Sequence, residues 1–133
     1  MKALLDLNFI IPISIACFWA IIFIQSGMDK VLDLKGNVDW LKGHFAKTFI
    51  GKFTGPLVIV IAIFELIAGG SSLIGLGVFL VNGSTKFIIA GVVVSIISLL
   101  MLIFGQRLAK DYEGAKTIAI YFGIALLSAY LLS

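Results

Sequence analysis

The sequence predicts an all-α integral membrane protein: a four-helix bundle with a short interfacial amphipathic helix between the first and second spans. Of the 133 residues, 61% are hydrophobic and 13% are charged, whereas soluble domains carry about 25% charged residues. The mean hydropathy is +1.17. Four apolar segments approach or exceed the roughly 18–20 residues that cross a bilayer. We expect a single membrane domain over 1–133, with spans at about 9–27, 56–81, 87–104 and 117–132 and the interfacial helix at about 37–50.

The first span has too long an apolar core and too small a basic lead to be a cleaved signal peptide. Its helix is expected to continue past Gly27, because no proline follows closely and Gly36 is the first good C-terminal stop. This end of the helix carries the polar side chains of Gln25, Ser26 and Lys30.

The connection that follows is predicted to contain the amphipathic helix. Its apolar residues recur every three or four positions, while its lysines fall on the other face. Asn37 can cap this helix, and Trp40 can anchor it at the level of the lipid headgroups. The apolar positions are Val38, Leu41, Phe45 and Phe49.

The sequence contains one histidine, His44, and one cysteine, Cys17. We expect His44 to be a solvated residue, since no second histidine or carboxylate cluster completes a metal site. A single cysteine excludes a CxxC redox pair, a thiolate zinc site and an intramolecular disulfide. Nothing in the sequence fits a haem, flavin, iron–sulfur or copper centre, so independent catalysis is not expected.

The second span contains one acid, Glu65, nine residues beyond Pro56 and therefore about 13–14 Å along the helix, near the middle of the bilayer. An ionised side chain there opposes insertion by about 2.5 to 3.5 kcal/mol, while each large apolar residue favours insertion by about 0.3 to 0.6 kcal/mol. The many apolar residues outweigh the acid. Glu65 is then expected to face protein, a pore or a ligand, and to be paired or protonated.

The third and fourth spans each carry a face of small residues, which permits close packing of a neighbouring helix. Asn82 and the three residues after it form the turn before the third span. Because the connections are short, successive spans are expected to be antiparallel neighbours. The small-residue faces are Gly91, Ser95 and Ser98 in the third span, and Ala115, Ala119 and Gly123 in the fourth.

The basic residues predict the orientation in the membrane. Eight of them lie on the side of the first and third connections and two on the side of the termini, which favours termini outside. The lysines are spread between apolar segments, so we interpret them as contacts with membrane lipid and see no nucleic-acid footprint.

The polar end of the first span and the acid of the antiparallel second span predict a cluster of Glu65, Lys30, Gln25 and Ser26. Such a cluster can bind the head of a lipid-soluble ligand, and quinone is the cofactor that fits, because its carbonyls need donors and its reduction takes up protons. The alternative is that the same contacts only fix the packing of two helices.

The string SGMDKVLDLKG at 26–36 resembles the SGxxKLxDFxG that closes the first helix of DoxX-type membrane proteins, and FELIAGGSSLIGL at 64–76 resembles their second helix. The resemblance implies a four-helix bundle in a bacterial or archaeal cytoplasmic membrane. It also implies links to quinone-dependent thiosulfate oxidation or to oxidative-stress complexes. The family's marked positions here are Gly27, Lys30, Asp33, Gly36 and Glu65.

Two functions are therefore expected. The first is a DoxX-like, non-catalytic subunit or scaffold of a membrane complex, docked to other membrane or periplasmic subunits. The alternative is a quinone-binding membrane subunit of an oxidoreductase whose catalytic chemistry lies in a partner chain. Transport is a third reading, which would require several copies to form a pore.

Overall fold

The computed structural model describes residues 6–133, and within them it contains five α-helices, one 3-10 turn and no strand. Four of these helices are long and apolar enough to cross a membrane, as the sequence predicts. The long helices are α2 (Leu7–Leu32), α4 (Thr54–Asn82), α5 (Lys86–Leu108) and α6 (Tyr112–Leu132), and the shorter elements are α3 (Leu34–His44) and η1 (Gly51–Phe53).

Helix α2 continues past Gly27 as predicted, but it ends at Leu32 and not at Gly36. The reason is Asp33, whose side chain accepts a hydrogen bond from the backbone N–H of Gly36 at 3.3 Å and so starts the next helix. Gly36 therefore lies in the first turn of α3, where a Cβ would collide with the Asp33 carboxylate. The glycine leaves room for the cap of α3 and does not stop α2.

Helix α3 starts and ends earlier than the predicted 37–50, and turns and η1 follow it up to α4. Asn37 does not cap α3 but lies inside it. Its side-chain amide donates to the backbone oxygens of Asp29 at 3.1 Å and Asp33 at 2.9 Å. Both oxygens also accept a backbone hydrogen bond, Asp29 from the Asp33 N–H at 3.3 Å and Asp33 from the Asn37 N–H at 3.0 Å, so the amide adds a second bond to each at the junction of α2 and α3.

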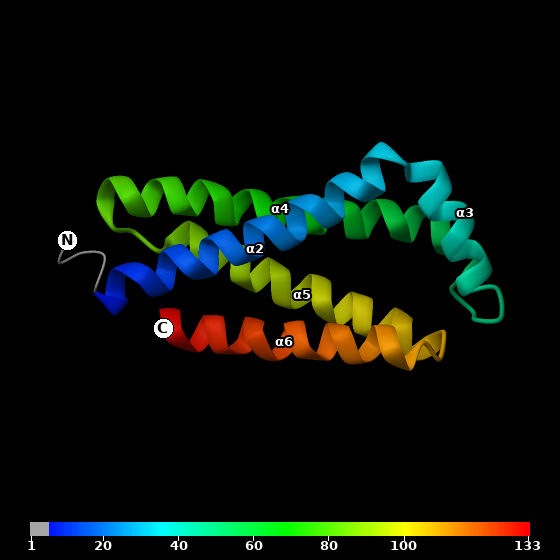
Figure 1. The fold of residues 1–133 in the computed structure, drawn as a ribbon. Coiled ribbons are helices and arrows are strands. Elements are labelled where there is room, and N and C mark those ends of the chain that lie inside the picture. The colour runs from blue at the N-terminus through cyan, green and yellow to red at the C-terminus, as the bar shows by residue number, and fades with distance from the viewer. Residues whose placement is uncertain (1–5) are drawn as a thin grey trace.

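The long helices run alternately up and down, so that α2 begins and α6 ends at one end of the molecule, and α3 lies at the other (Figure 1). Helix α4 packs along both α2 and α5, and α5 packs along α6. A large side chain joins α2 to α6: Trp19 is fully buried and its Nε1 donates to Ser128 Oγ at 3.1 Å. Trp19 also stacks on Phe23, with ring centroids 5.6 Å apart, in the core.

The small-residue face predicted on the third span is buried. A Cβ on Gly91 would lie 3.0 Å from the Ala68 carbonyl oxygen, so the glycine allows α5 to approach the backbone of α4. The face predicted on the fourth span is different, because Ala119 and Gly123 are exposed. Of the predicted face only Ala115 is buried, and helix α6 also buries Ala125 and Ser128.

Candidate functional site

A buried polar cluster joins α2 to α4 near the α3 end of the molecule. Ser26 and Lys30 are four residues apart and so share a face of α2. Across from them, Glu65 of α4 is fully buried. Ser26 Oγ donates to Glu65 Oε2 at 2.5 Å, and Lys30 Nζ lies 2.7 Å from Glu65 Oε1. Three of the four residues that the sequence predicts here are thus in direct contact.

Lys30 and Glu65 form an ion pair. Although Nζ lies close to Oε1, the two groups are not aligned as in a hydrogen bond, and Oε1 accepts none from the described residues. The Lys30 ammonium donates instead to Ser26 Oγ at 2.9 Å. Ser26 therefore accepts from Lys30 and donates to Glu65, and the three side chains form a closed network inside the protein.

Two glycines bring the helix backbones together around this network. A Cβ on Gly27 would lie 3.3 Å from the backbone nitrogen of Leu66, and a Cβ on Gly69 would lie 2.7 Å from that of Ile24. Side chains at these positions would push the helices apart. Glu65 directly precedes the first of these contacts along α4, and it is fully buried.

Gln25, the fourth predicted member, is not part of the cluster. It is exposed and makes no side-chain hydrogen bond within residues 6–133. Successive residues of an α-helix are about 100° apart around its axis, so the side chain of Gln25 is turned away from the face that Ser26 shares with Lys30.

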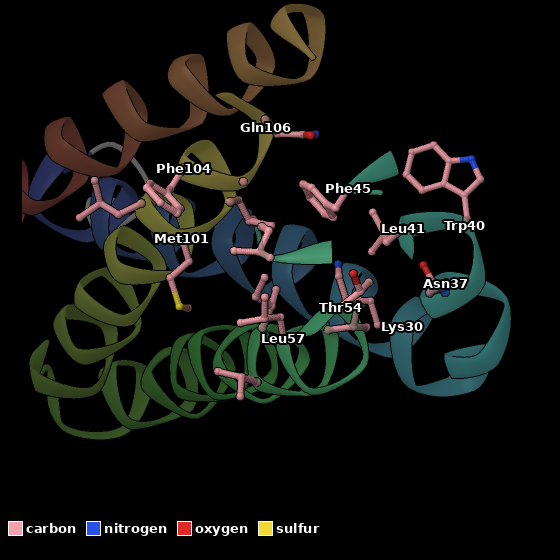
Figure 2. A pocket seen from close by; sticks show the side chains of 17 residues that line it. Lys30, Asn37, Trp40, Leu41, Phe45, Thr54, Leu57, Met101, Phe104 and Gln106 are labelled. Atoms are coloured by element: carbon pink, nitrogen blue, oxygen red, sulfur yellow. The ribbon is translucent and has the colours of Figure 1, made fainter. Parts of the chain in front are cut away.

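A pocket of about 580 Å³ adjoins the cluster between α3, α4 and the end of α5. Its volume is within the range of about 300–1,000 Å³ typical of small-molecule sites. Figure 2 shows Leu57, Met101 and Phe104 in one part of the pocket, with Lys30 and Asn37 in another. The pocket is therefore mostly apolar, and the Lys30 ammonium and the Asn37 amide lie on the side of α2 and α3, where Leu41 and Phe45 also contribute.

The hydrogen-bonding groups near Lys30 are largely in use. The Thr54 hydroxyl donates to the Gly51 carbonyl oxygen at 2.6 Å. Both amide hydrogens of Asn37 go to backbone oxygens, which fixes the orientation of the amide and leaves its Oδ1 as an acceptor. Among the described residues that line the pocket, Lys30 alone is charged.

His44 is half-buried beside Gln106, which lines the pocket, and it is not the solvated residue that the sequence predicts. Its Nε2 lies 3.0 Å from Gln106 Oε1, and because an amide oxygen can only accept, Nε2 carries the hydrogen. The His44 ring stacks on Trp40 with centroids 5.0 Å apart, and Asp111 Oδ2 lies 3.7 Å from Nε2. These contacts attach α3 to the α5–α6 connection.

Most pocket residues gave no signal in the sequence. His44 and Gln106 are 62 positions apart, and nothing in either segment indicates that they meet. Asn37 was recognisable as a helix-capping residue, but the helix that it caps is the preceding one. Phe45 and Leu41, which were expected on the apolar face of the amphipathic helix, do line the pocket.

Comparisons with models of known protein families, with curated proteins and with solved structures find no match to this chain. Within residues 6–133, no group of three or more His, Cys, Asp or Glu residues could hold a metal ion. The arrangement can instead hold an amphiphilic molecule, with its apolar part between α4 and α5 and its head beside the Lys30 ammonium.

Proposed function

We propose that this chain is a membrane subunit that binds the head of a lipid-soluble ligand, with quinone as the candidate, in the pocket beside Lys30. The observation that carries the proposal is that this pocket is mostly apolar and contains one ammonium group. A quinone fits such a site, because its carbonyl oxygens need donors and its tail needs an apolar wall.

The proposed setting is a bacterial cytoplasmic membrane, in which the four long helices form a four-helix bundle and α3 lies at the interface. Trp40 and Phe49 support this, since both are about two-thirds exposed, at 67% and 66%, beside several lysines. The excess of basic residues at this end supports termini outside. Cysteines introduced at Trp40 and Asn82 in a Cys17→Ser background test the orientation: cytoplasmic labelling at Asn82 would contradict it.

The catalytic chemistry is assigned to a partner subunit. The resemblance of residues 26–36 and 64–76 to DoxX-type proteins supports a place in a redox-linked membrane complex. The pocket supports a role in presenting a ligand, because one ammonium group can orient a carbonyl but supplies no electrons. The partner would be a membrane or periplasmic protein that donates electrons to the bound ligand.

The test is the quinone content of the protein purified in a mild detergent. Leu57 lines the pocket, so Leu57→Trp fills it, while Leu73→Trp places the same side chain on an exposed face of α4 away from the pocket. We expect quinone to co-purify with the wild type and with Leu73→Trp and to be lost from Leu57→Trp. Equal quinone content in all three proteins, or none in the wild type, would contradict the proposal.

A second candidate function is a non-catalytic scaffold. The observation in its favour is that Glu65 does not line the pocket and that its carboxylate faces Ser26 and Lys30, so the cluster is able to act purely in helix packing. In that case co-purification of partner subunits would depend on the α2–α4 seam. Filling the pocket through Leu57→Trp would then leave the complex intact.

A further inference from the structure

The charge that a ligand meets in the pocket is set by a residue outside it. Lys30 is the charged residue of the lining, and the fully buried Glu65 lies behind it, with Oε1 2.7 Å from Nζ. An ammonium and a carboxylate paired in this way carry a net charge of zero.

An anionic head would gain little from such a pair. Moving an anion out of water carries a large penalty, which is offset where an opposite charge or free hydrogen-bond donors face the anion. Two polar groups near Lys30 offer an anion no free donor, because the amide hydrogens of Asn37 and the Thr54 hydroxyl all go to backbone oxygens. A neutral head with an accepting oxygen can contact the Lys30 ammonium and brings no charge with it.

We propose that the pocket selects uncharged amphiphiles whose head presents a carbonyl oxygen, and that Glu65 is the residue that determines this specificity. The inference rests on the proposed function, since it assumes that the pocket holds a lipid-soluble ligand. Glu65 acts without touching the ligand, by cancelling the charge of Lys30. When Glu65 is made neutral, the same pocket becomes a site for anionic amphiphiles, because the incoming anion then replaces the missing carboxylate.

The experiment compares the affinities of two amphiphiles of equal chain length for the full chain in a non-ionic detergent, by native mass spectrometry. Methyl palmitate has a neutral ester head, and hexadecanesulfonate remains charged at every working pH. The variants are Glu65→Gln, with a net charge of +1 in the pair, and the double variant Lys30→Gln/Glu65→Gln, with a net charge of zero. Circular dichroism melts report whether each variant is folded.

We expect the wild type to bind the ester about tenfold or more tightly than the sulfonate, which corresponds to about 1.4 kcal/mol. Glu65→Gln should reverse this preference, and the double variant should restore it. If the wild type binds both amphiphiles equally, the charge selection is wrong while the proposed function stands. If the wild type binds neither, both fail. Should Glu65→Gln not fold, Glu65→Ala, which also leaves a net charge of +1 in the pair, takes its place, and a preference for the ester in that variant would overturn the role given to Glu65.

Discussion

Lys30 and Glu65 lie 2.7 Å apart but differ in their access to solvent: the Lys30 side chain is 17% exposed and that of Glu65 only 1%. The lysine reaches the cluster from the last turns of α2, whereas the acid is enclosed in the α2–α4 seam. A lysine that loses its partner can extend its ammonium toward the headgroups. The glutamate has no such route.

Because of this difference in exposure, we expect replacement of Lys30 and replacement of Glu65 to lower the free energy of unfolding by different amounts. Lys30→Met should destabilise the protein by about 3–5 kcal/mol, because it leaves a buried carboxylate unpaired, and Glu65→Leu should cost less. The double variant Lys30→Met/Glu65→Leu should recover much of the loss. The measurement is the free energy of unfolding in mixed micelles; equal single losses that simply add in the double variant would show that the pair is not coupled.

The glycines of α4 provide a matched pair for testing the close seam. A Cβ at Gly69 would lie 2.7 Å from the Ile24 nitrogen, whereas nothing lies within 4 Å of one at Gly70. Gly69→Ala should therefore destabilise the protein by about 1–3 kcal/mol. Gly70→Ala should be neutral or stabilise it by up to about 1 kcal/mol, through helix propensity. Thermal melts in detergent distinguish them, and similar melting temperatures for both variants would contradict the close approach.

Because Trp19 donates a hydrogen bond to Ser128 on α6, we expect this small side chain to contribute to the stability of the protein. Ser128→Ala should cost about 1–3 kcal/mol, because it leaves the buried indole N–H without an acceptor. Ser98→Ala is the control: that hydroxyl is also buried, but it donates only to the Val94 carbonyl oxygen of its own helix. Unfolding free energies should therefore differ between the two variants, and Trp19 fluorescence should change with Ser128→Ala alone.

The contact of His44 with Gln106 predicts that α3 is held against the rest of the molecule by a side chain. His44→Phe keeps an aromatic ring for Trp40 to stack on but removes the hydrogen bond. A loss of about 1 kcal/mol should raise amide hydrogen exchange in α3 about fivefold. Lys42→Met, at an exposed position of the same helix, should leave exchange unchanged. Unaltered exchange in His44→Phe would show that other contacts hold α3.

The long helices were predictable because bilayer thickness imposes a length and an apolar composition that can be read without knowing the packing. The pairing of Glu65 with Lys30 was predictable as well, because antiparallel neighbours bring these depths together. The prediction for Gln25 was wrong, because depth in the membrane does not determine which polar side chains of α2 face α4. The angular position around the helix axis does, and Gln25 is exposed.

The burial of the small-residue faces, the bounds of α3 and the pocket depend on which other helix packs against each helix face. The small residues of α5 pack on α4 as expected, but the equivalent pattern on α6 is partly exposed, since spacing within one helix does not identify its partner. The boundaries of α3 depend on Asp33 and Asn37, whose side chains act on the junction between two helices. The pocket is lined by residues of four helices and has no signature in any one of them.

The two bonds of Asn37 have a mechanical consequence. They hold α3 to backbone oxygens on the last turn of α2, so the angle between these helices is fixed at an elbow and not by packing along their length. Lys30 is on that same turn, and Leu41 and Phe45 at the far end of α3 line the pocket. A change in the angle at this elbow would move the wall formed by Leu41 and Phe45 relative to the Lys30 ammonium, so the backbone geometry of the elbow sets the largest head that the pocket admits.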